Sequence, residues 1–145
     1  MIRLPTILLR SAIAASLVLA PLCASAELVV IVSAKNPVPA LRADQVADIF
    51  LGQVTSFPEG GRAVAVDHLV HTAQRDEFYR KLTGKTPSLL KIYWSKMIFT
   101  GRGEPPRELF DSAAVRRAVA DNPGMIGYLD RNELDSSVKM VLALP

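Results

Sequence analysis

Residues able to hold a small anion are gathered in one short segment of this chain, Val66-Asp67-His68-Leu69-Val70-His71-Thr72-Ala73-Gln74-Arg75. Backbone N–H groups at the start of a helix, hydroxyl groups and an arginine together hold an oxyanion such as phosphate well. The segment offers the hydroxyl of Thr72, where a helix is predicted to begin, and the guanidinium of Arg75 one turn later. His71 would add a donor that strengthens below about pH 6.5, where imidazole becomes protonated. We therefore predict an oxyanion site at Thr72, Arg75 and His71.

Two of these residues also have a purely structural explanation. Thr72 would cap the helix whether or not it binds a ligand, and Arg75 could form a surface ion pair with Asp76 or Glu77. Ser33 is a fourth candidate, because it ends the first predicted strand and ligands of open α/β sheets bind at the carboxyl ends of strands. For Ser33 we favour the structural explanation, a residue that starts a loop.

A metal site or a catalytic site has little support in the sequence. His68 and His71 stand beside Asp67, but no distant third ligand is evident, whereas zinc needs three or four. Gly-x-Ser-x-Gly and Gly-x4-Gly-Lys motifs are absent, and the one cysteine, Cys23, falls in a segment that we expect to be removed. We therefore expect a protein that is not an enzyme and that uses no metal or cofactor.

Alternating strands and helices would place the oxyanion segment at the edge of a sheet. Residues 28–32 form a continuous apolar run, typical of a strand buried on both faces. Further strands are predicted at 63–66, 125–129 and 138–144. Helices are predicted over 41–51, 73–83, 87–98 and 112–120, with Thr72, Thr86 and Asp111 as N-caps. The pattern indicates an α/β fold with a central sheet flanked by helices.

The third of these helices carries the strongest local signal in the chain. Its apolar residues recur at the spacing of one helix face, and we expect them to form a single buried stripe. These residues are Leu89, Leu90, Tyr93, Trp94, Met97 and Ile98.

The first 26 residues have the features of a secretory signal peptide. Arg3 and Arg10 accompany an apolar run over 11–22, and Ala24-Ser25-Ala26 fits a cleavage site. The run is too short to span a bilayer comfortably, and Cys23 lacks the preceding small residue of a lipoprotein. We therefore expect one exported, periplasmic domain, residues 27–145. It would hold fifteen basic and fourteen acidic residues, so the net charge of +3 of the whole chain gives no reason to expect nucleic acid as a partner.

Four sequence blocks, in the right order, resemble the periplasmic phosphate-binding proteins of ABC importers. They are Asn36-Pro37-Val38 with Gln45-Val46-Ala47-Asp48-Ile49-Phe50-Leu51-Gly52; Arg75-Asp76-Glu77-Phe78; Trp94 with Phe99-Thr100-Gly101 and Pro105-Pro106; and Val119-Ala120-Asp121-Asn122-Pro123-Gly124-Met125-Ile126-Gly127-Tyr128. The last block is the most specific. Full-length members clamp a ligand between two lobes, so the resemblance implies a single periplasmic-binding-protein-like lobe.

The resemblance implies that the chain binds phosphate or a related inorganic oxyanion for an ABC-type importer. Its partners would be the anion, an ABC permease or another envelope protein, and a second copy of the chain if a homodimer closes over the ligand. The family has an arginine at the strand end and a Ser-Gly-Thr triplet at the helix start, where this chain has Asp67 and, near the triplet's place, His71-Thr72-Ala73. These departures favour an alternative function, an interaction module of an envelope assembly that has lost ligand binding. An exposed apolar patch where the second lobe would sit would support this alternative.

Overall fold

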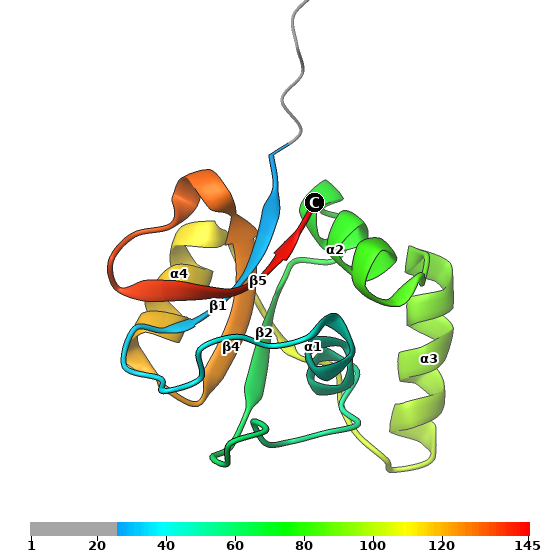
Figure 1. The fold of residues 1–145 in the computed structure, drawn as a ribbon. Helices are drawn as coiled ribbons and strands as arrows, with labels where there is room; N and C mark the ends of the chain where they lie inside the picture. Colours follow the sequence, from blue (N-terminus) through cyan, green and yellow to red (C-terminus); the bar gives the residue numbers. More distant parts are fainter. Residues whose placement is uncertain (1–25) are drawn as a thin grey trace, which may run out of the picture.

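Five strands form one mixed sheet in the computed structural model, which describes residues 26–145 (Figure 1). The strands are β1 Leu28–Ser33, β2 Val64–His68, β3 Arg107–Leu109, β4 Met125–Asp130 and β5 Val138–Leu144. Their order across the sheet is β3-β2-β4-β1-β5. β2 runs parallel to β3 and β4, whereas β1 runs antiparallel to β4 and β5. The predicted signal peptide, residues 1–26, lies outside the described residues apart from Ala26.

Helices cover both faces of the sheet, which confirms the predicted architecture of a central sheet flanked by helices. α1 Ala43–Phe50 and α2 Ala73–Thr83 pack on one face, with α3 Pro87–Phe99 in the same hydrophobic cluster. α4 Ser112–Asp121 packs on the other face. All six residues of β1 are buried, and successive side chains alternate between the two clusters, as Val30 and Ile31 do. The prediction of a strand buried on both faces is confirmed.

The predicted starts of three helices are also confirmed. Thr72, Thr86 and Asp111 each accept a hydrogen bond from the backbone N–H three residues further on. Gly84 ends α2 with a φ of +71°, a left-handed conformation that glycine adopts without steric cost. These local signals were sufficient because each cap involves only residues within one turn of the helix end.

Several elements differ from the predicted pattern. β2 continues to His68 instead of ending at residue 66, and a short 3-10 helix, Arg131–Glu133, was not predicted. α1 begins at Ala43 rather than at residue 41, because the Leu41 N–H donates to the Val141 carbonyl of β5 at 3.0 Å and holds Leu41 in the preceding loop. β3 was not predicted, since three mostly exposed residues are too few to show an alternating pattern.

The predicted apolar stripe of α3 is only partly correct. Leu90, Trp94 and Met97 are buried, but Leu89 is 51 % exposed and Ile98 is 56 % exposed. The rest of the protein covers α3 on one side, so residues to either side of that contact face solvent. The outer face of α3 is therefore apolar without being covered by the described residues.

The most specific motifs of the sequence contact each other. Asn36 donates from Nδ2 to the Pro123 carbonyl at 2.8 Å and accepts from the Val38 N–H at 2.8 Å. Gly127 lies against α4, where a Cβ atom would come within 2.8 Å of Val115 Cγ1. Both motifs thus have a structural role, since they join the loop after β1 to the turn before β4 and let α4 approach the sheet closely.

Candidate functional site

The predicted oxyanion segment lies where the carboxyl ends of three parallel strands meet. β2, β3 and β4 end side by side at His68, Leu109 and Asp130. α2 starts shortly after β2, and α4 starts shortly after β3, so two helix N-termini lie at this edge (Figure 1). Helix N-termini favour negative charge. The edge is therefore suited electrostatically to an anion.

An anion is already present just below this edge, in the form of the Asp67 carboxylate. Asp67 is 1 % exposed. Its Oδ2 accepts hydrogen bonds from Tyr79 Oη at 2.6 Å and from Arg75 Nε at 3.3 Å. Its Oδ1 accepts from the His68 backbone N–H at 2.8 Å and from the Tyr128 hydroxyl. Four donors thus compensate the cost of burying this charge.

The two tyrosines are fixed as donors to Asp67. Burial raises the pKa of Tyr79 and of Tyr128 well above the usual value, and the nearby Asp67 carboxylate raises both further. Both hydroxyls therefore keep their protons at neutral pH. His68 completes the network, because its Nε2 lies 2.7 Å from the Tyr128 carbonyl and must carry the proton to donate to it.

Arg75 is anchored by this network and faces a cleft. Its guanidinium carbon lies 5.2 Å from the ring centre of Tyr79. Burial is the largest single influence and opposes the charge of Arg75, but Asp67 together with Tyr79 and Tyr128 raises the pKa of Arg75 above its usual value. Within residues 26–145 only Nε of the guanidinium makes a hydrogen bond, so the two terminal nitrogens are left without a protein acceptor. They are available to an anion in the cleft.

The cleft next to Arg75 has a volume of about 540 Å³ and lies between the loop after β2, α3 and the segment before β3. Its cationic groups are Arg75, Lys91 and, when protonated, His71. Its one acidic group, Glu108, already accepts a hydrogen bond from the Val70 N–H at 2.6 Å. The full lining comprises Val70, His71, Arg75, Pro87, Ser88, Leu90, Lys91, Trp94, Ser95, Ile98, Pro105, Pro106 and Glu108. The wall is mostly apolar, with the basic groups as its main polar feature.

The structure brings three of the four predicted site residues to one edge of the sheet. Arg75 and His71 line the cleft, and Thr72 lies between them in the chain as the N-cap of α2. The Thr72 hydroxyl donates to the Leu69 carbonyl at 2.8 Å and accepts from the Arg75 N–H. Its hydrogen-bonding capacity is thus largely used inside the chain.

Ser33 is not part of this group. β1 runs antiparallel to β4, so Ser33 lies at the opposite edge of the sheet from Arg75. The Ser33 hydroxyl is buried and donates to the Ala120 carbonyl of α4 at 3.1 Å. The carboxyl ends of strands lie together only where the strands are parallel. Because β1 is not parallel to β2, the end of β1 lies away from the end of β2.

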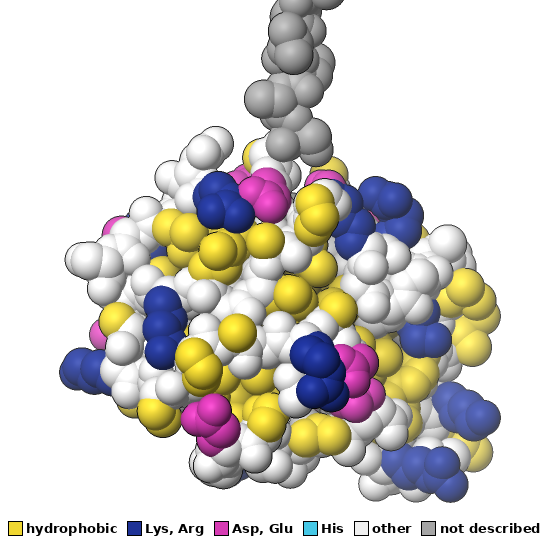
Figure 2. All heavy atoms as spheres, in the orientation of Figure 1, with side chains coloured by type: hydrophobic (Ala, Val, Ile, Leu, Met, Phe, Trp, Pro, Cys, Tyr) yellow, Lys and Arg dark blue, Asp and Glu magenta, His cyan; other side chains and the backbone are white. Residues whose placement is uncertain are grey.

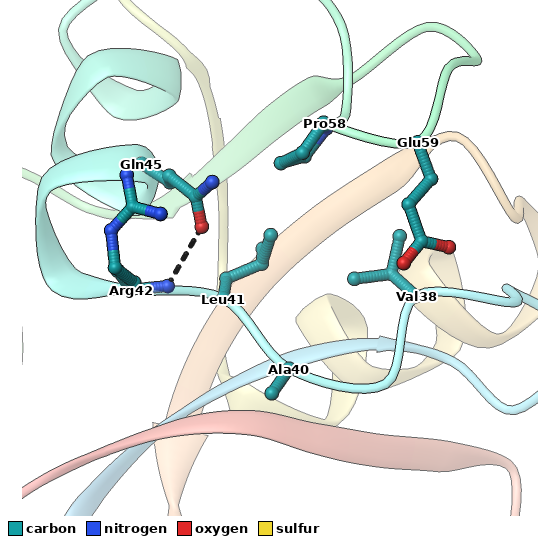
Figure 3. A pocket seen from close by; sticks show the side chains of 7 residues that line it. All are labelled: Val38, Ala40, Leu41, Arg42, Gln45, Pro58 and Glu59. Atoms are coloured by element: carbon teal, nitrogen blue, oxygen red, sulfur yellow. Dashed lines mark hydrogen bonds between the residues drawn. The ribbon is translucent and has the colours of Figure 1, made fainter.

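A second hollow, of about 350 Å³, is a weaker candidate (Figure 3). It lies before and around the start of α1, and its charged groups are a paired arginine and a glutamate. The Gln45 side-chain oxygen accepts from the Arg42 N–H at 2.9 Å, the Arg42 guanidinium binds Asp44, and Glu59 faces the opening. The charge of Arg42 is thus already balanced by Asp44, and Glu59 would repel an anion here.

The sequence-based prediction did not find the partners that hold Arg75 in place. Tyr79 lies four residues after Arg75, on the same face of α2, and this spacing could have linked the two. Tyr128 comes from another strand, and nothing local in the sequence connects it to Asp67. Trp94 was expected in the core, and it is buried, but its indole N–H has no acceptor within residues 26–145.

Residues 26–145 show neither a metal-binding cluster nor a membrane-spanning helix. No group of three or more His, Cys, Asp or Glu side chains is placed to hold a metal ion in this part of the chain. No helix of the same part is long and apolar enough to cross a membrane.

In sequence comparisons, neither a protein-family model nor a curated protein matches the chain. Solved structures do match its fold. A protein from Clostridium perfringens, described as a phosphate ABC transporter substrate-binding protein with bound phosphate, superimposes with a TM-score of 0.65 at 24 % identity. The match covers 80 % of this chain and 44 % of that one.

Two further structures agree with this similarity. An ABC-type phosphate transport receptor from Vibrio cholerae gives a TM-score of 0.64 at 18 % identity, over 80 % of this chain and 45 % of its own. PstS from Borrelia burgdorferi gives a TM-score of 0.58 at 12 % identity, over 80 % of this chain and 46 % of its own. The described chain therefore has the fold of one lobe of a phosphate-type substrate-binding protein, and it spans less than half the length of these proteins.

Proposed function

We propose that this chain is an exported, non-enzymatic binding lobe that holds phosphate or a related oxyanion in the cleft beside Arg75. The observation that carries the proposal is the state of Arg75. Its Nε is fixed by the buried Asp67, its terminal nitrogens have no acceptor among the described residues, and Arg75 lines the cleft. An arginine oriented in this way is suited to two parallel hydrogen bonds to an oxyanion.

His71, Lys91 and the start of α2 support the same proposal. His71 and Lys91 line the cleft with Arg75 and add cationic character. Thr72 contributes by capping the helix, which keeps the positive end of α2 beside the cleft. Asp67 acts as a positioning residue in this proposal, because it binds the side of the guanidinium that faces away from the ligand.

The proposed context is delivery of the anion to an ABC-type importer in the periplasm. The solved structures of similar fold are described as binding proteins of phosphate transport rather than as enzymes. A predicted signal peptide at residues 1–26 supports export. A single lobe leaves one side of the ligand uncovered, so a second copy or the permease would have to complete the enclosure.

Calorimetry with inorganic phosphate and sulfate tests the proposal. We expect saturable binding to the purified protein, weakened about tenfold or more by Arg75→Lys, which keeps the charge but loses the planar pair of donors. Arg80→Lys is the matched control, because Arg80 lies on the same helix and is exposed. Circular dichroism would verify that both variants are folded. Absence of binding to wild type, or equal binding by Arg75→Lys, would refute the proposal.

A second candidate function, an interaction module, is favoured by the uncovered apolar side chains of α3. Ile92 is 64 % exposed and Phe99 is 92 % exposed, and α3 with its flanks over 85–103 contains four basic residues but no acidic one. Figure 2 shows hydrophobic and basic side chains next to one another on the α3 side of the molecule. A protein partner with an apolar, acidic surface would fit this face.

Sedimentation analysis and cross-linking distinguish this second function from the first. An interaction module should form a dimer or a complex that Phe99→Ser disrupts and that Ser95→Ala, on the cleft side of the same helix, leaves intact. A monomer that binds phosphate and forms no such complex would exclude the second function.

A further inference from the structure

We infer that the natural ligand of the Arg75 cleft is an organic anion, with one anionic head group and an apolar body. This inference rests on the proposed function, since it takes Arg75 as the residue that holds the head group. It differs from inorganic phosphate binding in what fills the rest of the cleft.

The size and lining of the cleft carry this inference. A volume of about 540 Å³ lies in the range of pockets that enclose small organic molecules, about 300–1,000 Å³. Leu90, Trp94, Ile98 and Pro106 supply the apolar wall of the cleft. A bare phosphate at Arg75 would leave this wall in contact with water, whereas an apolar group on the ligand would displace that water favourably.

Trp94 supplies an aromatic side chain to the wall of the cleft. Trp94 lines the cleft, is 5 % exposed, and has a buried Nε1–H with no acceptor within residues 26–145. Buried donors are nearly always satisfied in folded proteins. Because Nε1 is closed to solvent, an oxygen of a ligand would reach it only after the indole ring shifts.

The charges around the cleft limit the ligand to one anionic group. Arg75, Lys91 and His71 attract a negative head group, but Glu108 lies on the lining as well. A second negative charge on the ligand body would be repelled by Glu108 in this partly enclosed space. Phosphate monoesters and carboxylates with an aromatic or aliphatic body meet these conditions.

Comparing three probes tests the inference: phenyl phosphate, inorganic phosphate and phenol. Trp94 is the one tryptophan of the chain, so its fluorescence reports directly on occupation of the cleft, and calorimetry gives the affinities. We expect phenyl phosphate to bind about tenfold or more tightly than phosphate, because the ring buries apolar surface. Phenyl phosphate should change Trp94 fluorescence more than phosphate does.

A pair of isoleucines on α3 provides matched variants that should fold normally, because both are more than half exposed. Ile98 lines the cleft and Ile92 does not. Ile98→Ser should weaken phenyl phosphate several-fold and leave inorganic phosphate unchanged, whereas Ile92→Ser should affect neither.

The outcomes separate the inference from the proposed function. Equal affinity for phenyl phosphate and phosphate, both dependent on Arg75, would overturn the inference and leave the proposed function standing. Phenol binding as tightly as phenyl phosphate, with no effect of Arg75→Lys, would overturn both. No binding of any probe would also overturn both.

Discussion

Asp67→Asn is the substitution that most directly tests how the site is held together. Asparagine preserves the shape of the side chain but replaces Oδ2 by an NH₂ group, which would face the Arg75 Nε–H and the Tyr79 hydroxyl. The Arg75 guanidinium would lose its buried counter-charge, and breaking a buried ion pair by removing one partner typically costs about 3–5 kcal/mol. Because Arg75 can still reach water through the cleft, we expect the low end, about 3 kcal/mol of unfolding free energy.

Urea unfolding followed by circular dichroism measures this loss. With a slope of about 1–3 kcal/mol per molar urea for a small protein, 3 kcal/mol lowers the midpoint by about 1–3 M. Glu77→Gln is the matched control, because Glu77 forms a more exposed ion pair with Lys81 at 2.7 Å, and such pairs contribute about 0–1 kcal/mol. If Asp67→Asn and Glu77→Gln have the same small effect, then Asp67 does not stabilise the site as we infer.

Three further outcomes are expected. Gly127→Ala should destabilise the fold by about 1–3 kcal/mol in urea unfolding, because the added Cβ would collide with α4. Gly84→Ala is the control and should cost only about 1 kcal/mol, because its Cβ meets open space and only the positive φ opposes it. A larger loss for Gly84→Ala than for Gly127→Ala would contradict this packing. The stability that depends on protonated Tyr79 and Tyr128 should be fully present below about pH 10, the usual tyrosine pKa. Above this pH the unfolding free energy should fall by up to about 1.4 kcal/mol per pH unit for each tyrosine, because the unfolded chain releases protons that the folded chain keeps. Urea midpoints between pH 8 and 11 measure this decline, which should be shallower in Tyr128→Phe, and an unchanged slope in that variant would refute the assignment. Asn36→Ala should cost about 1–3 kcal/mol, since it removes two hydrogen bonds of a buried side chain, and a thermal midpoint equal to that of wild type would contradict this role.

Local signals in the sequence predicted most of the secondary structure. The caps at Thr72, Thr86 and Asp111 involve residues within one turn, and the β-branched run of β1 indicates a doubly buried strand wherever the strand is placed in the sheet. These features were predictable because their physical cause lies within a few neighbouring residues. The pattern of buried and exposed residues on α3 was not predictable in this way, because it depends on which side of the helix the rest of the chain covers.

The sequence by itself determined which residue types could serve an oxyanion site, and it placed Thr72, Arg75 and His71 within four residues of one another. Only the tertiary structure decided how they could act. Asp67 and Tyr128 lie on β2 and β4, strands far apart in sequence but adjacent in the sheet. Asp67 binds the Nε of Arg75, which lines a cleft that α3 helps to build. The antiparallel direction of β1 separated Ser33 from that edge. Strand order and direction depend on contacts over the whole chain, so spacing in the sequence could not reveal them.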